Sequence, residues 1–122
     1  MPRALVADDS STMRKILIRS LNACGLTDVV EAADGAEAIR LFAEESFDLV
    51  LTEWNMPVKS GLDLIQEIRA SGAKVPIIMI TTEAEKSRVI EVIKAGVSDY
   101  VIKPFTAEML REKIEKVMGQ IA

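Results

Sequence analysis

Five short apolar runs constrain the fold of this chain more than any other feature. They are rich in Val, Ile and Leu, show no alternation between apolar and polar residues, and lie at 4–7, 29–32, 49–52, 75–81 and 100–102. Such runs are typical of strands that are buried on both faces of a parallel sheet. Crossovers between parallel strands are right-handed almost without exception, so few topologies remain open to the chain.

Apolar residues at spacings of three and four fall between these runs and predict five helices. Their expected apolar faces are Met13, Ile16, Leu17, Leu21 and Cys24; Ala38, Ile39 and Phe42; Leu62, Ile65 and Ile68; Val89, Ile90 and Ile93; and Leu110, Ile114, Val117, Met118 and Ile121. Asp34 and Glu37 fit an N-cap and its capping-box partner, and Thr106 can cap the last helix. The expected helix ends are Gly25, Gly72 and Gly96.

The alternation of strand and helix, repeated five times, predicts an α/β fold with an open parallel sheet and helices on both faces. The length of 122 residues suits a single domain over 1–122, with a core large enough to need no disulfides. We expect the last helix to run to residue 122, with no output domain after it.

The composition excludes several kinds of binding and catalytic site. With 15 basic and 19 acidic residues the net charge is −4, which disfavours a nucleic-acid binder that neutralises phosphates. The chain has no His and a single Cys, which excludes an intramolecular disulfide, a thiolate metal cluster, a His-based catalytic triad and the usual zinc ligands. No apolar run approaches the ~20 residues of a membrane span, and the N-terminus lacks a signal-peptide pattern, so we expect a cytoplasmic protein.

Polar residues follow four of the five predicted strands. Asp8 and Asp9 come after the first, Glu53 after the third, Thr81 ends the fourth, and Lys103 follows the fifth. In an open parallel sheet, ligands bind beyond the carboxyl ends of the strands. If the first and third strands are neighbours, three carboxylates converge there.

Three neighbouring acids repel one another and need a cation or a proton. Oxygen ligands suit Mg²⁺, Lys103 adds a fixed positive charge, and Thr81 adds a hydroxyl. This combination is suited to holding a phosphoryl group. Each fragment alone has a plainer interpretation, because an Asp-Asp pair often caps a helix and Lys-Pro often just ends a strand. Their joint placement at one edge favours the phosphoryl site.

The motifs Ala7-Asp8-Asp9-Ser10, Trp54-Asn55-Met56-Pro57, Thr81 and Tyr100 to Phe105 together resemble the receiver domains of bacterial response regulators. The likeness covers the whole chain and is greatest to the stand-alone chemotaxis regulators of that family. It implies a flavodoxin-like five-stranded sheet of order 2-1-3-4-5.

The resemblance also assigns roles. Asp8 and Asp9 look like the Mg²⁺-binding acids, and Asn55 would supply a backbone carbonyl to the metal. Thr81 resembles the switch hydroxyl, and Tyr100 resembles the aromatic residue that swings inward on activation. Lys103 looks like the lysine that pairs with the phosphoryl group, with a cis peptide bond to Pro104.

Partners are implied in the same way. They would be a sensor histidine kinase and either a flagellar switch component or another relay protein, bound by a monomer that is not an enzyme. The output face would be built from the fourth helix, the fifth strand and the fifth helix, and would include Lys86, Val89, Ile90, Ala95, Tyr100, Phe105 and Lys116.

Glu53 departs from the family pattern, which has Asp as the phosphoryl acceptor. Glutamate adds a methylene, and a misplacement of about 1 Å costs on the order of 100-fold in rate, so we expect little or no phosphorylation. Three explanations stay open: an engineered mimic of phosphoaspartate, a natural atypical receiver that acts only by binding partners, or an inactivating change. Glu53 would either ligate Mg²⁺ or form a salt bridge with Lys103.

Two other functions compete. A flavodoxin-like carrier of FMN would need glycine and hydroxyl groups around the flavin phosphate, whereas Asp8 and Asp9 would repel it. A small Mg²⁺-dependent phosphohydrolase would need a competent nucleophile, and Glu53 is a poor one.

Overall fold

The computed structural model describes residues 2–119. Its five strands form one parallel sheet of order β2-β1-β3-β4-β5. The strands are β1 Arg3–Ala7, β2 Asp28–Ala32, β3 Leu49–Thr52, β4 Ile77–Thr81 and β5 Asp99–Ile102. The helices are α1 Ser11–Ala23, α2 Gly35–Glu44, α3 Gly61–Ala70, α4 Lys86–Ala95 and α5 Ala107–Met118. The predicted α/β class, strand order and alternation are confirmed; the fourth strand begins at Ile77, after Pro76, rather than at residue 75.

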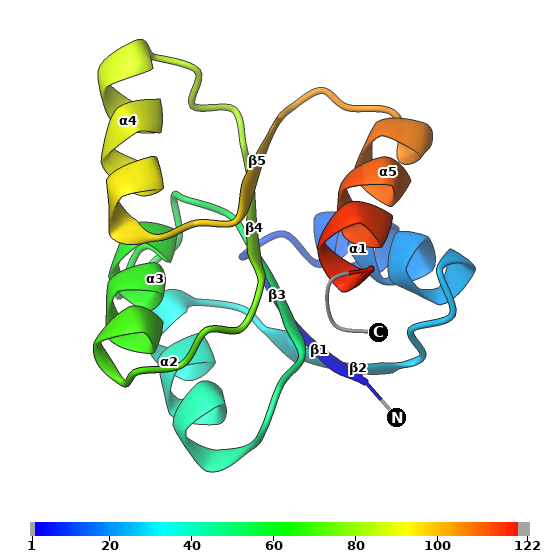
Figure 1. Ribbon diagram of the computed structural model, residues 1–122, viewed down its shortest axis with the longest axis horizontal. Helices are drawn as coiled ribbons and strands as arrows, with labels where there is room; N and C mark the ends of the chain where they lie inside the picture. The colour runs from blue at the N-terminus through cyan, green and yellow to red at the C-terminus, as the bar shows by residue number, and fades with distance from the viewer. Residues whose placement is uncertain (1, 120–122) are drawn as a thin grey trace.

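The sheet is the middle of three layers (Figure 1). α1 and α5 cover one face, and α2, α3 and α4 cover the other. Successive residues of each strand point to opposite faces, so β1 sends Ala4 and Val6 into the α1–α5 core and Leu5 and Ala7 into the α2–α4 core. Both cores are apolar, which explains why the strands read as continuous apolar runs.

The register aligns the carboxyl ends of the strands. Ala7 pairs with Ala32 and Thr52, and Thr81 pairs with Ile102. The backbone bonds continue one residue further, from Glu53 N to the carbonyl of Ala7 at 3.0 Å. The residues that follow β1, β3 and β5 therefore leave the sheet at one edge.

Side-chain caps begin four of the five helices, and two of these caps, Asp34 and Thr106, were predicted. The side chains of Ser10, Asp34, Ser60 and Thr106 each accept a bond from a backbone N–H of the first turn. Asp34 is confirmed as an N-cap, but Glu37 Oε1 accepts from Ala33 N, one residue before the cap, rather than closing a capping box. The reciprocal box is instead at the start of α3, between Ser60 and Asp63.

The predicted apolar face of α4 is wrong in part. Val92 is the buried residue of this helix, whereas Ile90 and Ile93 are 41% and 57% exposed. Ile16 of α1 is also exposed, at 40%. These side chains fit the helical spacing, but they lie at the margins of the faces that meet the sheet. In α3, Leu64 is fully buried and Leu62 only partly, so that face is rotated from the predicted one.

The predicted last helix extends further than the described one. α5 ends at Met118, with Gly119 as its C-cap, and the expected contribution of Ile121 lies outside the described residues. Among residues 2–119, every helix falls short of the length and hydrophobicity that crossing a bilayer requires.

Candidate functional site

Lys103 brings together acids from two other strand ends. Its Nζ is 3.4 Å from Oδ2 of Asp8 and 3.1 Å from Oε1 of Glu53. The lysine side chain is 16% exposed and the two carboxylate side chains 2% and 10%. One cation thus neutralises two largely buried acids, at the edge where ligands bind in open parallel sheets.

Asp8 is held from several sides. Its Oδ1 accepts from Ser10 N at 2.9 Å, and its backbone carbonyl accepts from Nη1 of Arg14 at 2.7 Å. Burial raises the pKa of the Asp8 carboxyl, while the Ser10 bond and Lys103 lower it. Burial is the largest of these effects, so the ionised carboxylate favours an added cation.

Glu53 has a bonding partner for each carboxylate oxygen. Lys103 binds Oε1, and Trp54 N donates to Oε2 at 2.7 Å. The Glu53 carbonyl accepts from Thr52 Oγ1 at 2.9 Å. One of the two expected arrangements of Glu53, the salt bridge with Lys103, is present. Ligation of Mg²⁺ by Glu53 stays a prediction.

Thr81 and Tyr100 meet at Glu83, in the connection between β4 and α4. The Oγ1 of Thr81, fully buried, accepts from Glu83 N at 3.2 Å. The Tyr100 hydroxyl donates to the Glu83 carbonyl. Burial, followed by the charges of Glu83 and Glu53, raises the pKa of Tyr100 to about 12. Both residues proposed as switch elements are therefore tied to the same loop.

Asp9 and Asn55 are exposed, beside the buried pair. Within residues 2–119 no three Asp, Glu or Cys side chains are grouped so that they could hold a metal. The expected convergence of three carboxylates is therefore not found, because Glu53 faces Lys103 and Asp9 faces solvent. The donors that remain, two carboxylates and a backbone carbonyl, are the oxygen type that Mg²⁺ prefers when it keeps several waters.

The peptide bond between Lys103 and Pro104 is cis, as the resemblance implied. Lys103 N also donates to the Thr81 carbonyl at 2.8 Å, which continues the β4–β5 pairing beyond the strand. The Lys103 side chain is directed toward the two acids.

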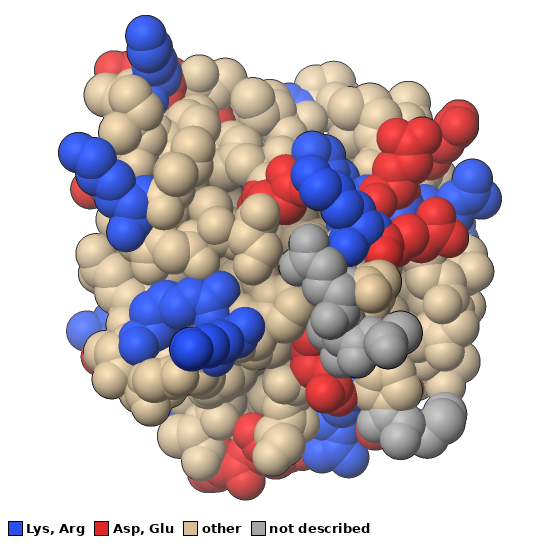
Figure 2. All heavy atoms as spheres, viewed as in Figure 1, with Lys and Arg blue, Asp and Glu red and all other residues tan. Residues whose placement is uncertain are grey.

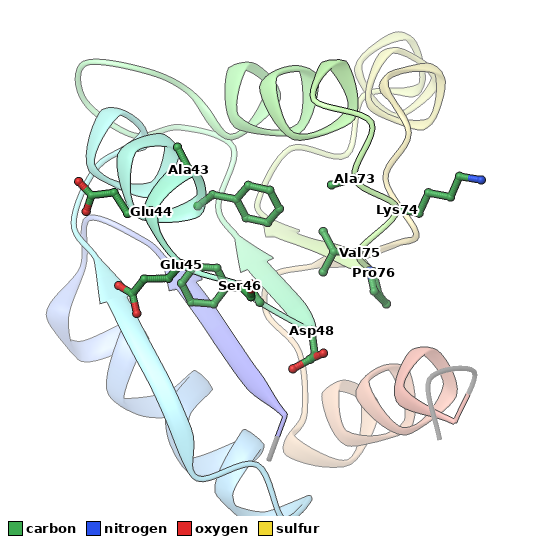
Figure 3. A pocket seen from close by; sticks show the side chains of 11 residues that line it. Ala43, Glu44, Glu45, Ser46, Asp48, Ala73, Lys74, Val75 and Pro76 are labelled. Atoms are coloured by element: carbon green, nitrogen blue, oxygen red, sulfur yellow. The ribbon is translucent and has the colours of Figure 1, made fainter.

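A hollow lies elsewhere, at the amino-terminal edge of β3 and β4 (Figure 3). It has a volume of about 550 Å³ and is lined by the connections before those strands, including Glu45, Asp48 and Lys74. None of the predicted site residues lines it. Lys103 lines a different hollow, together with Thr82, Pro104 and Phe105.

Charged groups of both signs are interspersed on the face shown in Figure 2. Lys and Arg side chains form separate clusters there, several with acidic neighbours. Among the described residues on this face no continuous basic stripe is visible, which agrees with the net charge of −4.

Sequence reasoning missed three contributors, which are Arg14, Arg88 and Glu83. Arg14 supports the Asp8 backbone, and Arg88 lies over the ring of Trp54 at 4.4 Å. Arg14 follows Asp8 by six residues and Arg88 follows Trp54 by 34, so no short motif links either pair. Glu83 was the one contributor with a signal, since it follows Thr81 by two residues.

Comparison with known proteins gives a consistent result. Residues 4–115 match the response regulator receiver domain family. The chain is 48% identical to chemotaxis protein CheY1 of Helicobacter pylori, over 96% of this chain and 97% of that protein. It is 42% identical to chemotaxis protein CheY of Pseudomonas aeruginosa, over 98% of each.

Solved structures agree. Chemotaxis protein CheY4 of Vibrio cholerae superposes with a TM-score of 0.86 at 32% identity, covering 96% of this chain and 98% of that one. A Francisella response regulator receiver domain gives a TM-score of 0.91 at 27% identity, with both chains covered completely. With its acid pair, remote lysine and strand order, the chain belongs to the response regulator receiver domain family and is a CheY-like receiver of two-component signalling.

Proposed function

We propose that residue 53 is the phosphoryl acceptor position of this receiver and that Glu53 makes it a poor acceptor. The observation that carries the proposal is the position of Lys103, 3.1 Å from Glu53 and 3.4 Å from Asp8. A lysine at that place would neutralise phosphoryl oxygens on a side chain at position 53. Here the carboxylate of Glu53 itself binds Lys103, where the phosphoryl oxygens would otherwise lie.

The reaction requires an in-line approach to phosphorus. An aspartate oxygen would attack, an O–P bond would form, and the P–N bond of a kinase phosphohistidine would break with departure of the imidazole. In Glu53 one oxygen is engaged by Lys103 and the other by Trp54 N. An attack would have to break one of these bonds from a side chain one methylene too long.

Mg²⁺ fits the remaining donors. Asp8, Asp9 and the backbone carbonyl of Asn55 would hold it, and it would neutralise charge on a phosphoryl group when bound. Glu53 stays with Lys103 in this proposal, so the metal set is smaller than the four residues expected from the sequence.

Glu53 would act as a partial mimic of the phosphorylated state. A carboxylate has one negative charge and two oxygens, whereas a phosphoryl group brings nearly two charges and three oxygens. Moving an equilibrium from 1:99 to 99:1 takes about 5.5 kcal/mol of differential stabilisation. One ion pair does not supply that, and Thr81 and Tyr100, as the proposed switch residues, would shift only in part.

Output would pass through the α4-β5-α5 face to a protein partner. β5 is an edge strand, and exposed apolar side chains occur on all three elements of this face, at Ile90, Ile93, Ile102 and Met109. A partner that covers these side chains would gain free energy from burying apolar surface. By analogy with its chemotaxis relatives, the chain would act in the cytoplasm as a monomer between a histidine kinase and a flagellar switch or relay protein.

The test is phosphoryl labelling of the unchanged chain and of Glu53→Asp with acetyl phosphate and Mg²⁺, followed by intact mass. We expect the mass of one phosphoryl group on Glu53→Asp alone. Adding Lys103→Ala or Asp9→Ala to the Glu53→Asp background should abolish the label. Equal labelling of both acceptors would show that side-chain length at position 53 is unimportant, and the absence of label on Glu53→Asp would refute the acceptor role.

A further inference from the structure

Arg88, in the first turn of α4, covers the indole of Trp54. Its guanidinium carbon lies 4.4 Å from the ring centroid, within the range of a cation–π contact. Its Nε is buried and makes no hydrogen bond to the described residues. Glu83 Oε2 is 3.9 Å from that Nε, beyond hydrogen-bond length.

The contact is therefore weakly held. The attraction of the cation to the ring and the long ion pair with Glu83 favour the contact, and the buried Nε–H without a hydrogen-bond acceptor opposes it. The Arg88 side chain is also 41% exposed, so water is available as an alternative environment.

Trp54 connects Arg88 to the acceptor position. The backbone N–H of Trp54 donates to Oε2 of Glu53 at 2.7 Å, and its backbone carbonyl accepts from Gly61 N at 2.8 Å. Trp54 is 3% exposed, so its ring is packed in the core beside the backbone that contacts Glu53. Any group at position 53 that releases or redirects the Trp54 N–H also changes the ring on which Arg88 lies.

Glu83 connects Arg88 to the proposed switch residues. Its N–H binds Thr81, and its carbonyl accepts from Tyr100. Arg88 thus contacts one residue attached to position 53 and lies near the residue attached to Thr81 and Tyr100. Arg88 therefore lies between both arms of the site and α4.

We propose that Arg88 is a positioning residue that couples the side chain at position 53 to the position of α4 through its contact with Trp54. The role rests on the proposed use of residue 53. By reciprocity, a change at position 53 alters α4, and loss of the Arg88 contact alters the surroundings of residue 53 by the same free energy.

A cycle of substitutions tests this without a phosphodonor. Glu53→Asp is made in the unchanged chain and with Arg88→Met, which keeps length but removes the charge. Hydrogen exchange of the α4 amides reports the helix, the α1 amides serve as a reference for global stability, and emission of Trp54, the one Trp in the chain, reports the contact. Arg88→Lys is the conservative variant, and Arg40→Met on α2, whose side chain is exposed and pairs with Glu44, is the matched control.

With Arg88 present, Glu53→Asp should change α4 exchange by about fivefold, the lower end of typical coupling between sites, and shift Trp54 emission. With Arg88→Met the change should largely disappear, while Arg88→Lys restores part of it and Arg40→Met leaves it intact. An equal response with and without Arg88, or no α4 response with Arg88 present, would overturn the proposal. This experiment uses no phosphodonor. A failure of acetyl phosphate labelling would therefore refute the acceptor role of residue 53 without changing the outcome of the Arg88 cycle.

Discussion

A single buried hydroxyl shows how surroundings set side-chain chemistry in this receiver. The Tyr100 hydroxyl donates a hydrogen bond to the Glu83 carbonyl. The phenol is half-buried, and the charges of Glu83 and Glu53 act on it. Both burial and the negative charges disfavour the phenolate, so the pKa rises to about 12. The raised pKa keeps the hydrogen bond donor intact throughout the neutral and mildly alkaline range.

Tyrosinate absorbance measures this directly, because Tyr100 is the one Tyr in the chain. We expect a midpoint near 12 in the folded protein and about 10 in urea, the value of an unperturbed phenol. Since the folded pKa is the higher one, the stability from the protonated phenol is complete below about pH 10 and is lost as the pH rises toward 12. A folded midpoint at about 10 would show that the hydroxyl is not held as described.

Which residues reach the site was predictable, but which way they point was not. Asp8, Glu53 and Lys103 follow buried strands, and the parallel sheet fixes where such residues leave it. The partners of Thr81 depend on the path of the loop at Glu83, and the choice between metal ligand and salt bridge at Glu53 depends on rotamers. Those are tertiary properties that no spacing in the sequence encodes.

At the scale of elements, the start of α3 sets the position of residue 53. The capping box of Ser60 and Asp63 fixes the first turn, which brings Gly61 against the backbone of Glu53. A Cβ at Gly61 would lie 2.0 Å from the Glu53 carbonyl oxygen. Glycine is needed here for close approach of two backbones rather than for a special backbone angle.

Gly61→Ala should therefore destabilise the protein by about 2–3 kcal/mol, as overpacking does, although alanine is the better helix former. Gly72→Ala is the control, because its φ of +89° costs strain but nothing lies within 4 Å of a Cβ there. We expect about 1 kcal/mol for that change. Urea unfolding gives both values, and a Gly61→Ala protein as stable as the unchanged chain would contradict the close contact.

Helix existence was easier to predict than helix orientation. Caps and glycine stops are local, so Asp34, Thr106 and Gly96 could be assigned from the sequence alone. The buried face of α4 depends on how the helix lies on the sheet, and Ile90 and Ile93 fit the helical period while facing solvent. Periodicity alone does not separate the apolar residues of a helix that pack in the core from those that stay exposed.

For the whole molecule, the strand order is what creates the site. Asp8, Glu53 and Lys103 are 45 and 50 residues apart in sequence, and they meet because β1, β3, β4 and β5 are consecutive in the sheet with their ends aligned. The ion triad is therefore a product of topology as well as of residue type. The coupling free energy between its members therefore tests the fold and the site together.

A double-mutant cycle of Lys103→Met and Glu53→Gln, read by urea unfolding, tests this central claim most directly. Lys103→Met alone should cost about 3 kcal/mol, because it leaves two buried carboxylates without their cation. The cycle should give a coupling of about 1–3 kcal/mol between the two residues, as for contacting members of one network.

The exposed pair Arg40–Glu44 on α2 is the matched control, with an expected coupling of about 0.3–0.5 kcal/mol. A coupling between Lys103 and Glu53 that clearly exceeds this control is the predicted result. A coupling no larger than the control would contradict the account, because Lys103 would then not hold position 53 in the folded protein.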